Sequence, residues 1–230
     1  MKRILSVLII TLLIAAPVLA FASDTVCPEV IGKVDKGSDK YMSWDLNTPQ
    51  LTGLKNSKVE NSINKQLADT VSDFKKTLHD EAKKAYKESK KSKYPFRPFE
   101  AVAVYKVHLL NPKILSLTID LYQYTGGAHG STVKIAFNYD LKTGKELGYK
   151  DIFRNCVDYK KVIVDWVTRK IESNPENFFP DAIDTVKKFT DEQPFYITPD
   201  GIVVYYGLYE IAPYAAGIQE FPIPFSAFKC

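Results

Sequence analysis

A single long apolar stripe constrains the fold of this chain more than any other sequence feature. Across residues 58–90, apolar side chains recur at steps of three and four, which is the period of one face of a helix. The stripe consists of Val59, Ile63, Leu67, Val71, Phe74, Leu78 and Ala82. Pro95 and Pro98 end the helix. A helix of this length must cover an equally long apolar surface, so a sheet is expected beside it.

Strands are predicted directly after the helix. Residues 101–110 and 114–124 flank a short Asn-Pro-Lys turn, which is typical of a hairpin, and residues 132–139 form a third strand. Strand alternation divides the second strand into two faces. The apolar face holds Leu115, Leu117, Ile119 and Leu121, and the other holds Ser116, Thr118, Asp120, Tyr122 and Tyr124. We expect an antiparallel sheet with one buried and one partly polar face, and the helix on the buried face.

The second half of the chain predicts a smaller unit of helices and strands. Asp158 is a good N-cap for a helix over residues 159–171, and a shorter helix follows over residues 180–189. Strands are expected at residues 195–197, 202–206 and 219–223, the last at a sheet edge because prolines border it. Residues 23–57 contain several glycines and prolines and are expected to be extended and rich in loops.

The predicted fold class is therefore α+β. A long helix packs on an antiparallel sheet, and a smaller helix-plus-antiparallel-sheet unit follows. We expect the first unit to span residues 23–150 and the second to span residues 151–230, closely packed on the first.

Residues 1–22 have the pattern of a secretory signal peptide. Lys2 and Arg3 precede an apolar run, and Ala20-Phe21-Ala22 fits the small-x-small cleavage rule. An uncleaved anchor is the alternative, but Pro17 and the cleavage site favour removal. We expect an exported protein, periplasmic or extracellular, in the bacterial envelope, with no stable membrane span after cleavage.

Cysteine content and charge limit the possible partners. Export permits a disulfide, and Cys27, Cys156 and Cys230 allow three single pairings among which the sequence does not choose. No Cys-x-x-Cys motif is present and the three histidines are far apart, so neither a metal nor another cofactor is expected. The net charge is +4 with acidic and basic residues mixed, so no nucleic-acid partner is expected.

Two segments together resemble a known family. The first runs from the Tyr-Gln-Tyr-Thr-Gly-Gly-Ala-His-Gly motif at residues 122–130 through residues 137–147 to Asp-Ile-Phe at residues 151–153. The second combines residues 195–206 with the Tyr-Glu-Ile-Ala-Pro-Tyr-Ala-Ala-Gly motif at residues 209–217. These segments are similar to the paired domains of unknown function in the extracellular part of the anti-sigma factor RsiV. The same pair precedes the catalytic domain of the peptidoglycan deacetylase PdaC. The resemblance covers residues 35–226.

The resemblance implies an envelope binding module whose ligand is a lysozyme-like protein or peptidoglycan. Only three residues precede the apolar run, so no anti-sigma segment is expected, and no catalytic deacetylase domain follows the shared region. No catalytic residue is assigned, and the chain is expected to be a binding module more than an enzyme. The alternatives are a hydrolase of wall polysaccharide, with Glu210 and Asp120 as its carboxylates, and an inhibitor that acts by occlusion.

The candidate ligand-binding residues are Tyr124, His129, Glu210 and Tyr214. Each also has a structural interpretation: the His129 ring would bond a nearby backbone group, and Glu210 would form an ion pair within the fold. We expect at least one of Gly126, Gly127 and Gly130 to have a positive φ angle, and we expect this glycine loop to contact the loop at residues 209–217. Replacing Gly127 with valine is expected to cost more stability than removing the His129 ring.

Overall fold

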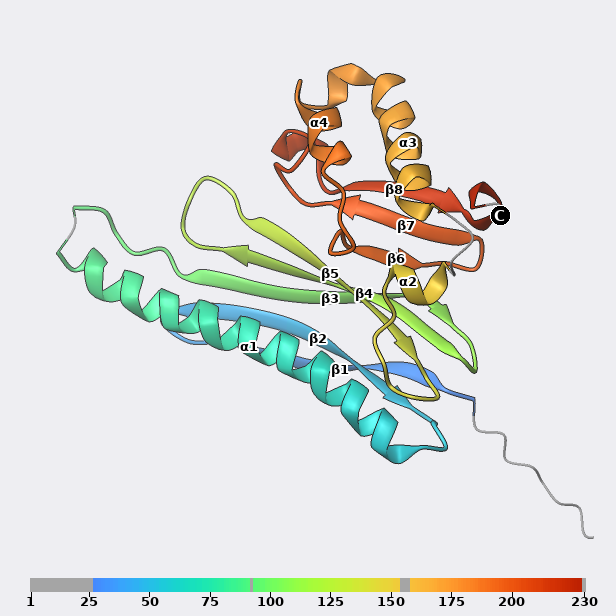
Figure 1. Cartoon of the computed structure of the whole chain (residues 1–230). Coiled ribbons are helices and arrows are strands. Elements are labelled where there is room, and N and C mark those ends of the chain that lie inside the picture. Colours follow the sequence, from blue (N-terminus) through green and yellow to red (C-terminus); the bar gives the residue numbers. More distant parts are fainter. Residues whose placement is uncertain (1–26, 92, 154–157, 229–230) are drawn as a thin grey trace, which may run out of the picture.

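The computed structural model describes residues 27–91, 93–153 and 158–228, and it has the predicted α+β architecture. Figure 1 shows the long helix α1, a five-stranded sheet above it and a smaller unit on the other side of that sheet. The predicted signal peptide, Cys156 and Cys230 lie outside the described residues, so signal cleavage and cysteine pairing remain predictions. Cys27 is exposed and makes no disulfide with a described residue.

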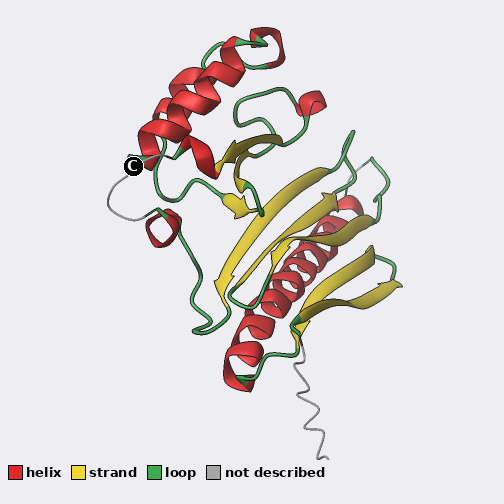
Figure 2. Ribbon diagram, turned by 90° about the vertical axis from the view of Figure 1, so that its right-hand side faces the viewer, coloured by secondary structure: helices red, strands yellow, loops and turns green. Residues whose placement is uncertain are grey.

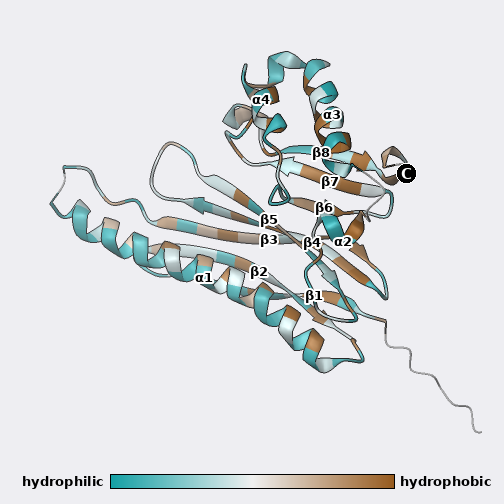
Figure 3. Cartoon of the chain, in the orientation of Figure 1, coloured by the Kyte–Doolittle hydropathy of each residue, from teal (hydrophilic) through white to brown (hydrophobic). Residues whose placement is uncertain are grey.

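Helix α1 (Ser57–Ser89) is the helix that the apolar stripe predicts. Asn56 caps it by accepting hydrogen bonds from the backbone N–H groups of Lys58 and Val59. Six residues of the stripe are buried, and the seventh, Phe74, packs at the edge of the same core. The helix lies along one face of the sheet, and its outward face is hydrophilic (Figures 2 and 3).

The large sheet has the strand order β1-β2-β3-β4-β5. Its strands are β1 (Glu29–Ser38), β2 (Met42–Thr52), β3 (Phe99–Leu110), β4 (Ile114–Tyr124) and β5 (Ser131–Asp140). The predicted antiparallel pairing holds for every pair except β2 and β3, which run parallel. The sheet is therefore mixed. The parallel pair follows from α1, which crosses over the sheet between these two strands.

Residues 23–57 were predicted to be extended and rich in loops; the extended chain is confirmed, but the loops are wrong, because β1 and β2 form a hairpin there. The Asp39 carboxylate accepts hydrogen bonds from the backbone N–H groups of Tyr41 and Met42 and fixes the turn. Gly32 and Gly37 lie within β1 and leave room for side chains of β2, with Gly37 beneath the Trp44 ring. Pro49 is tolerated because β2 pairs with β3 only from Met42 to Leu46.

The smaller unit contains the remaining helices and a second sheet. Its elements are α2 (Tyr149–Ile152), α3 (Tyr159–Glu172), α4 (Ala182–Lys187), β6 (Phe195–Ile197), β7 (Gly201–Tyr206) and β8 (Gln219–Pro224). As predicted, Asp158 caps α3, and β8 is an edge strand of the order β6-β7-β8. Helix α4 is shorter than predicted. Buried apolar side chains from all three helices and all three strands form a second core.

The two units join where β6 lies against the large sheet, on the face opposite α1 (Figure 1). Ser116 and Asn138, 0% and 4% exposed, hydrogen-bond to each other, with Ser116 Oγ donating to Asn138 Oδ1 at 2.7 Å. Asn138 Nδ2 donates to the Phe195 carbonyl, and the Ile197 N–H donates to Ser116 Oγ. The sheet face that carries Ser116 of β4 and Asn138 of β5 is thus buried at this point, because these two side chains hold β6.

Candidate functional site

The glycine loop and the loop at residues 209–217 meet, as the sequence predicts. The glycine loop connects β4 to β5, and the other loop connects β7 to β8. The Gly130 carbonyl accepts two hydrogen bonds, one from Nδ1 of His129 at 2.8 Å and one from the Tyr214 hydroxyl at 3.0 Å. The rings of His129 and Tyr214 stack with their centroids 4.0 Å apart. One buried carbonyl therefore fixes the relative position of both rings.

Two positions of the glycine loop, Gly126 and Gly130, require glycine. Gly126 has a φ of 86°, which confirms the expectation of a positive φ angle. Gly130 is buried, and a Cβ atom there would lie 2.3 Å from the Tyr122 ring. A Cβ on Gly127 would approach only the His129 carbonyl, at 3.9 Å, and its φ angle is an ordinary one. The structure therefore gives no steric reason for a side chain at Gly127 to cost more stability than removal of the His129 ring, and that comparison stays a prediction.

Exposed aromatic rings continue across both loops. Tyr209 is 57% exposed and stands 5.7 Å from the Tyr214 ring, between centroids. Its φ of 63° is in the left-handed region, which is costly for a side chain of this size. Tyr124 folds back onto the glycine loop and donates its hydroxyl hydrogen bond to the Gly127 carbonyl at 3.0 Å. We call Tyr124, His129, Tyr209 and Tyr214 the aromatic surface.

The two candidate carboxylates do not join His129. Glu210 accepts a hydrogen bond from the Gly207 backbone N–H at 2.6 Å, so it stabilises the turn of its own loop. Asp120 forms an ion pair with Lys134 at 3.1 Å, and Lys134 also pairs with Glu220 of β8 at 3.2 Å. Lys134 is only 13% exposed and thus links the two units. Both carboxylates have structural partners.

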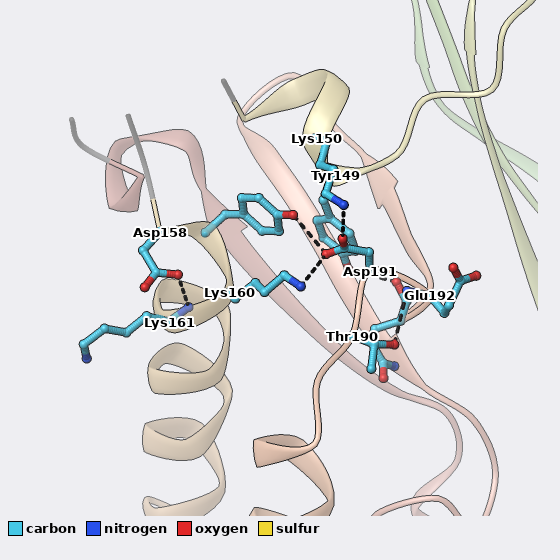
Figure 4. Close-up of polar contacts among 10 residues, drawn as sticks. Tyr149, Lys150, Asp158, Lys160, Lys161, Thr190, Asp191 and Glu192 are labelled. Carbon is cyan, nitrogen blue, oxygen red and sulfur yellow. Dashed lines mark hydrogen bonds and ion pairs between the residues drawn. The ribbon is translucent and has the colours of Figure 1, made fainter. Parts of the chain in front are cut away.

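A cavity of about 550 Å³ lies between β5, α2 and the segment before β6. Asp191 stands at its rim and accepts hydrogen bonds from Lys150, Lys160 and the Tyr159 hydroxyl, which the close-up in Figure 4 shows converging on it. These partners, Lys150 first, lower the pKa of Asp191 to about 2. The Asp191 carboxylate thus links the segment between α4 and β6 to both α2 and α3. We therefore interpret its role as structural.

Sequence reasoning missed Tyr209, Lys134 and Glu220. Lys134 lies opposite Asp120 in the β4–β5 register, so the alternation pattern contains this pair once the hairpin register is known. No sequence pattern marks the left-handed backbone of Tyr209. Within the described part of the chain, no group of three or more His, Cys, Asp or Glu side chains is placed to hold a metal ion. No helix of those same residues is long and apolar enough to cross a membrane.

Comparison with known proteins divides the chain into two family regions. The family model described as deacetylase PdaC matches residues 35–132, and the model of DUF3298, a protein family of unknown function, matches residues 150–226. The chain therefore carries a PdaC-like region followed by an RsiV-like DUF3298 region, as the quoted motifs predict.

Two relatives from Bacillus subtilis agree with this division. The chain is 30% identical over 128 residues to the peptidoglycan-N-acetylmuramic acid deacetylase PdaC, a match that covers 54% of this chain and 27% of the deacetylase. It is 27% identical over 213 residues to the anti-sigma-V factor RsiV, covering 85% of this chain and 70% of that protein. A solved DUF3298 family structure from Bacteroides fragilis has the same fold, with a TM-score of 0.63 and 22% identity over 86% of this chain and 90% of that one.

Proposed function

We propose that this chain is an exported binding module of the bacterial cell envelope and that the aromatic surface holds its ligand. The observation that carries the proposal is the row of rings formed by Tyr209, Tyr214 and His129. The row lies at the surface, and the Gly130 carbonyl fixes two of its rings. Exposed rings in a fixed arrangement bind ligands at little entropic cost, because few rotatable bonds remain to be ordered.

The contacts of the carboxylates favour binding over catalysis. A glycoside hydrolase needs two carboxyl groups that flank a substrate, one to donate a proton and one to act as a base or nucleophile. Glu210 is engaged by the Gly207 backbone and Asp120 by Lys134. Each group thus has a neighbour within the fold that accounts for its position, which favours a structural role for both.

We propose that the regions 23–150 and 151–230 act as one binding unit. The aromatic surface contains rings from both regions, and the buried Ser116–Asn138 pair holds them together. The ligand classes that the resemblance implies are a lysozyme-like protein and peptidoglycan. Tyrosine rings suit both, since they stack on sugar rings and are common at protein interfaces.

Retention on immobilised lysozyme and on purified sacculi tests this proposal. We expect the wild-type protein to be retained by one of the two and Tyr214→Ala to lose at least tenfold in affinity. Phe225→Ala, which removes a 40% exposed ring outside the aromatic surface, is the matched control and should bind like the wild type. A folded wild-type protein that neither material retains would refute the proposal.

The two alternatives need different measurements. Release of reducing ends from sacculi, abolished in Glu210→Gln or Asp120→Asn, would establish the hydrolase. Turnover of wall polymer by lysozyme, measured with and without this protein, separates an inhibitor that occludes the enzyme from a passive binder. We expect no release of reducing ends.

A further inference from the structure

A second cavity, of about 590 Å³, lies at the C-terminal end of α1. Its walls come from three segments that meet at one end of the molecule (Figure 1): the last turns of α1, the chain leading into β3, and the glycine loop. The lining includes Glu88, Ser89, Phe96, Arg97, Thr125 and Gly126. The cavity therefore adjoins the aromatic surface through the glycine loop.

Arg97 is one of the lining residues, and its guanidinium group is largely unengaged by the described residues. Its Nη1 donates to the Gly126 carbonyl at 3.5 Å, which is at the limit of a hydrogen bond. It forms no ion pair with any described residue, although Arg side chains have five donors in a planar fork. That fork matches the oxygen atoms of phosphate or carboxylate.

Lysines without acidic partners are frequent in the segment that ends α1 and follows it, although none is among the residues that line the cavity. Lys84, Lys87, Lys91 and Lys93 belong to the end of α1 and the segment after it, and none forms an ion pair within the described chain. Lys90 lies over the Tyr86 ring, 4.9 Å from its centroid. Glu88 is the single carboxylate in the lining. Basic residues at a helix C-terminus complement the helix dipole, but that effect falls off within the last turn and does not account for Lys84, Lys93 or Arg97.

We propose that this cavity binds the anionic groups, phosphate or carboxylate, of an acidic wall polymer. Arg97 supplies the fork for one such group, and the positive charge of the lysines in the adjoining segment attracts the flanking groups along the polymer. The polymer continues past Thr125 and Gly126 toward the aromatic surface. This continuation rests on the proposed function, whereas the anion site itself does not.

Direct binding to two polyanions tests the site. The probes are inorganic polyphosphate and polyglutamate, whose phosphate and carboxylate groups represent the two sources of negative charge. We expect the full chain to bind at least one, with affinity that falls as salt rises. Arg97→Gln should weaken binding at least tenfold, and the pair Lys87→Gln with Lys91→Gln at least threefold.

The control variant carries Lys33→Gln and Lys142→Gln, which remove the same charge from exposed positions on other elements. If this control weakens binding as much as the Lys87 and Lys91 pair, the effect is one of net charge and the proposal is wrong. Absence of binding to both probes at low salt would also overturn it. Tyr214→Ala separates the two proposals, because it should weaken retention on lysozyme or sacculi at least tenfold and leave polyphosphate binding unchanged.

Discussion

The smaller unit meets the large sheet at β6 through buried polar side chains that are hydrogen-bonded, whereas it meets the glycine loop through the exposed His129 ring and the half-buried Tyr214 ring, which share one acceptor. At β6, Ser116 and Asn138 bond to each other and to the backbone of β6. At the loops, His129 and Tyr214 converge on the Gly130 carbonyl, and Tyr209 projects into solvent.

This difference separates architecture from function. A buried polar group that loses its hydrogen-bond partner is left desolvated with nothing to compensate for the lost water. The contacts at β6 therefore decide whether the two units stay together. An exposed ring loses little when it is removed, so the aromatic surface is free to serve a ligand. The variants below test this division, and a large stability loss at the aromatic surface would contradict it.

The largest effect is expected at Asn138. Replacement by alanine removes the acceptor of the Ser116 hydroxyl and the donor to the Phe195 carbonyl, while Ser116 Oγ still accepts from the Ile197 N–H. We expect the free energy of unfolding to fall by about 3 kcal/mol. Urea denaturation measures this value, and a double-mutant cycle with Ser116→Ala should give strongly non-additive losses. A loss below about 1 kcal/mol would mean that the interface does not depend on this pair.

A pH effect is expected from His108, which lies at the same interface. Its ring stacks on Tyr196 at 3.7 Å, and its Nε2 is 2.9 Å from the Thr118 hydroxyl. Burial, followed by the charges of Lys106 and Lys134, lowers the pKa of His108 to about 4, while Asp120 acts in the opposite direction. The unfolded chain therefore binds this proton more readily than the folded protein does.

Above the ordinary histidine pKa of about 6.5, His108 is neutral in both the folded and the unfolded chain and does not reduce stability. As pH falls from there to about 4, the unfolded chain takes up the proton first, and the folded protein loses stability. Because the ring is only half buried, we expect the loss to be about 1–2 kcal/mol, less than the full shift implies. Thermal unfolding of the wild type and of His108→Gln between pH 7 and pH 4 measures it. If the stability of the wild type and that of His108→Gln fell equally with pH over this range, His108 would be excluded as the cause.

A smaller effect is expected in the glycine loop. Gly126→Ala places a side chain at a φ of 86° and should cost about 1 kcal/mol. Gly127→Ala, the matched control one residue away, should change stability by less than about 0.5 kcal/mol, since its Cβ meets only ordinary contacts. Comparable losses for both variants would show that the strain is not located at Gly126.

The extent of sequence prediction differs between the fold and the site for physical reasons. The stripe of α1 and the alternation of β4 are local periodicities, so these elements could be predicted almost to their ends. The β1–β2 hairpin was missed because its glycines and proline serve cross-strand packing and a free strand edge, neither of which is local. The burial of Ser116 likewise depends on Ile197, 81 positions away in the chain, so the partly polar pattern of its strand face did not reveal it.

At the site, the sequence predicted that the two loops meet, because small residues and tyrosines mark both. It did not predict the roles of the carboxylates. Glu210 and Asp120 are chemically equivalent in sequence, and only the fold decides that one accepts a backbone N–H and the other a lysine. Reactivity depends on partners that the chain brings together in three dimensions.

The smallest stability effect, with the clearest consequence for function, is expected at Tyr209. Glycine at this position removes the exposed ring and relieves the left-handed strain, but it also makes the unfolded chain more flexible. These two backbone effects nearly offset each other, so Tyr209→Gly should remain within about 0.5 kcal/mol of the wild type.

Tyr214→Ala should cost about 1–2 kcal/mol, because it loses the hydrogen bond to Gly130 and the stack on His129. If the aromatic surface holds the ligand, both variants weaken retention on lysozyme or sacculi by at least tenfold despite their different stabilities. A Tyr209→Gly protein that binds like the wild type would remove Tyr209 from the ligand site and leave its strained backbone without a functional reason.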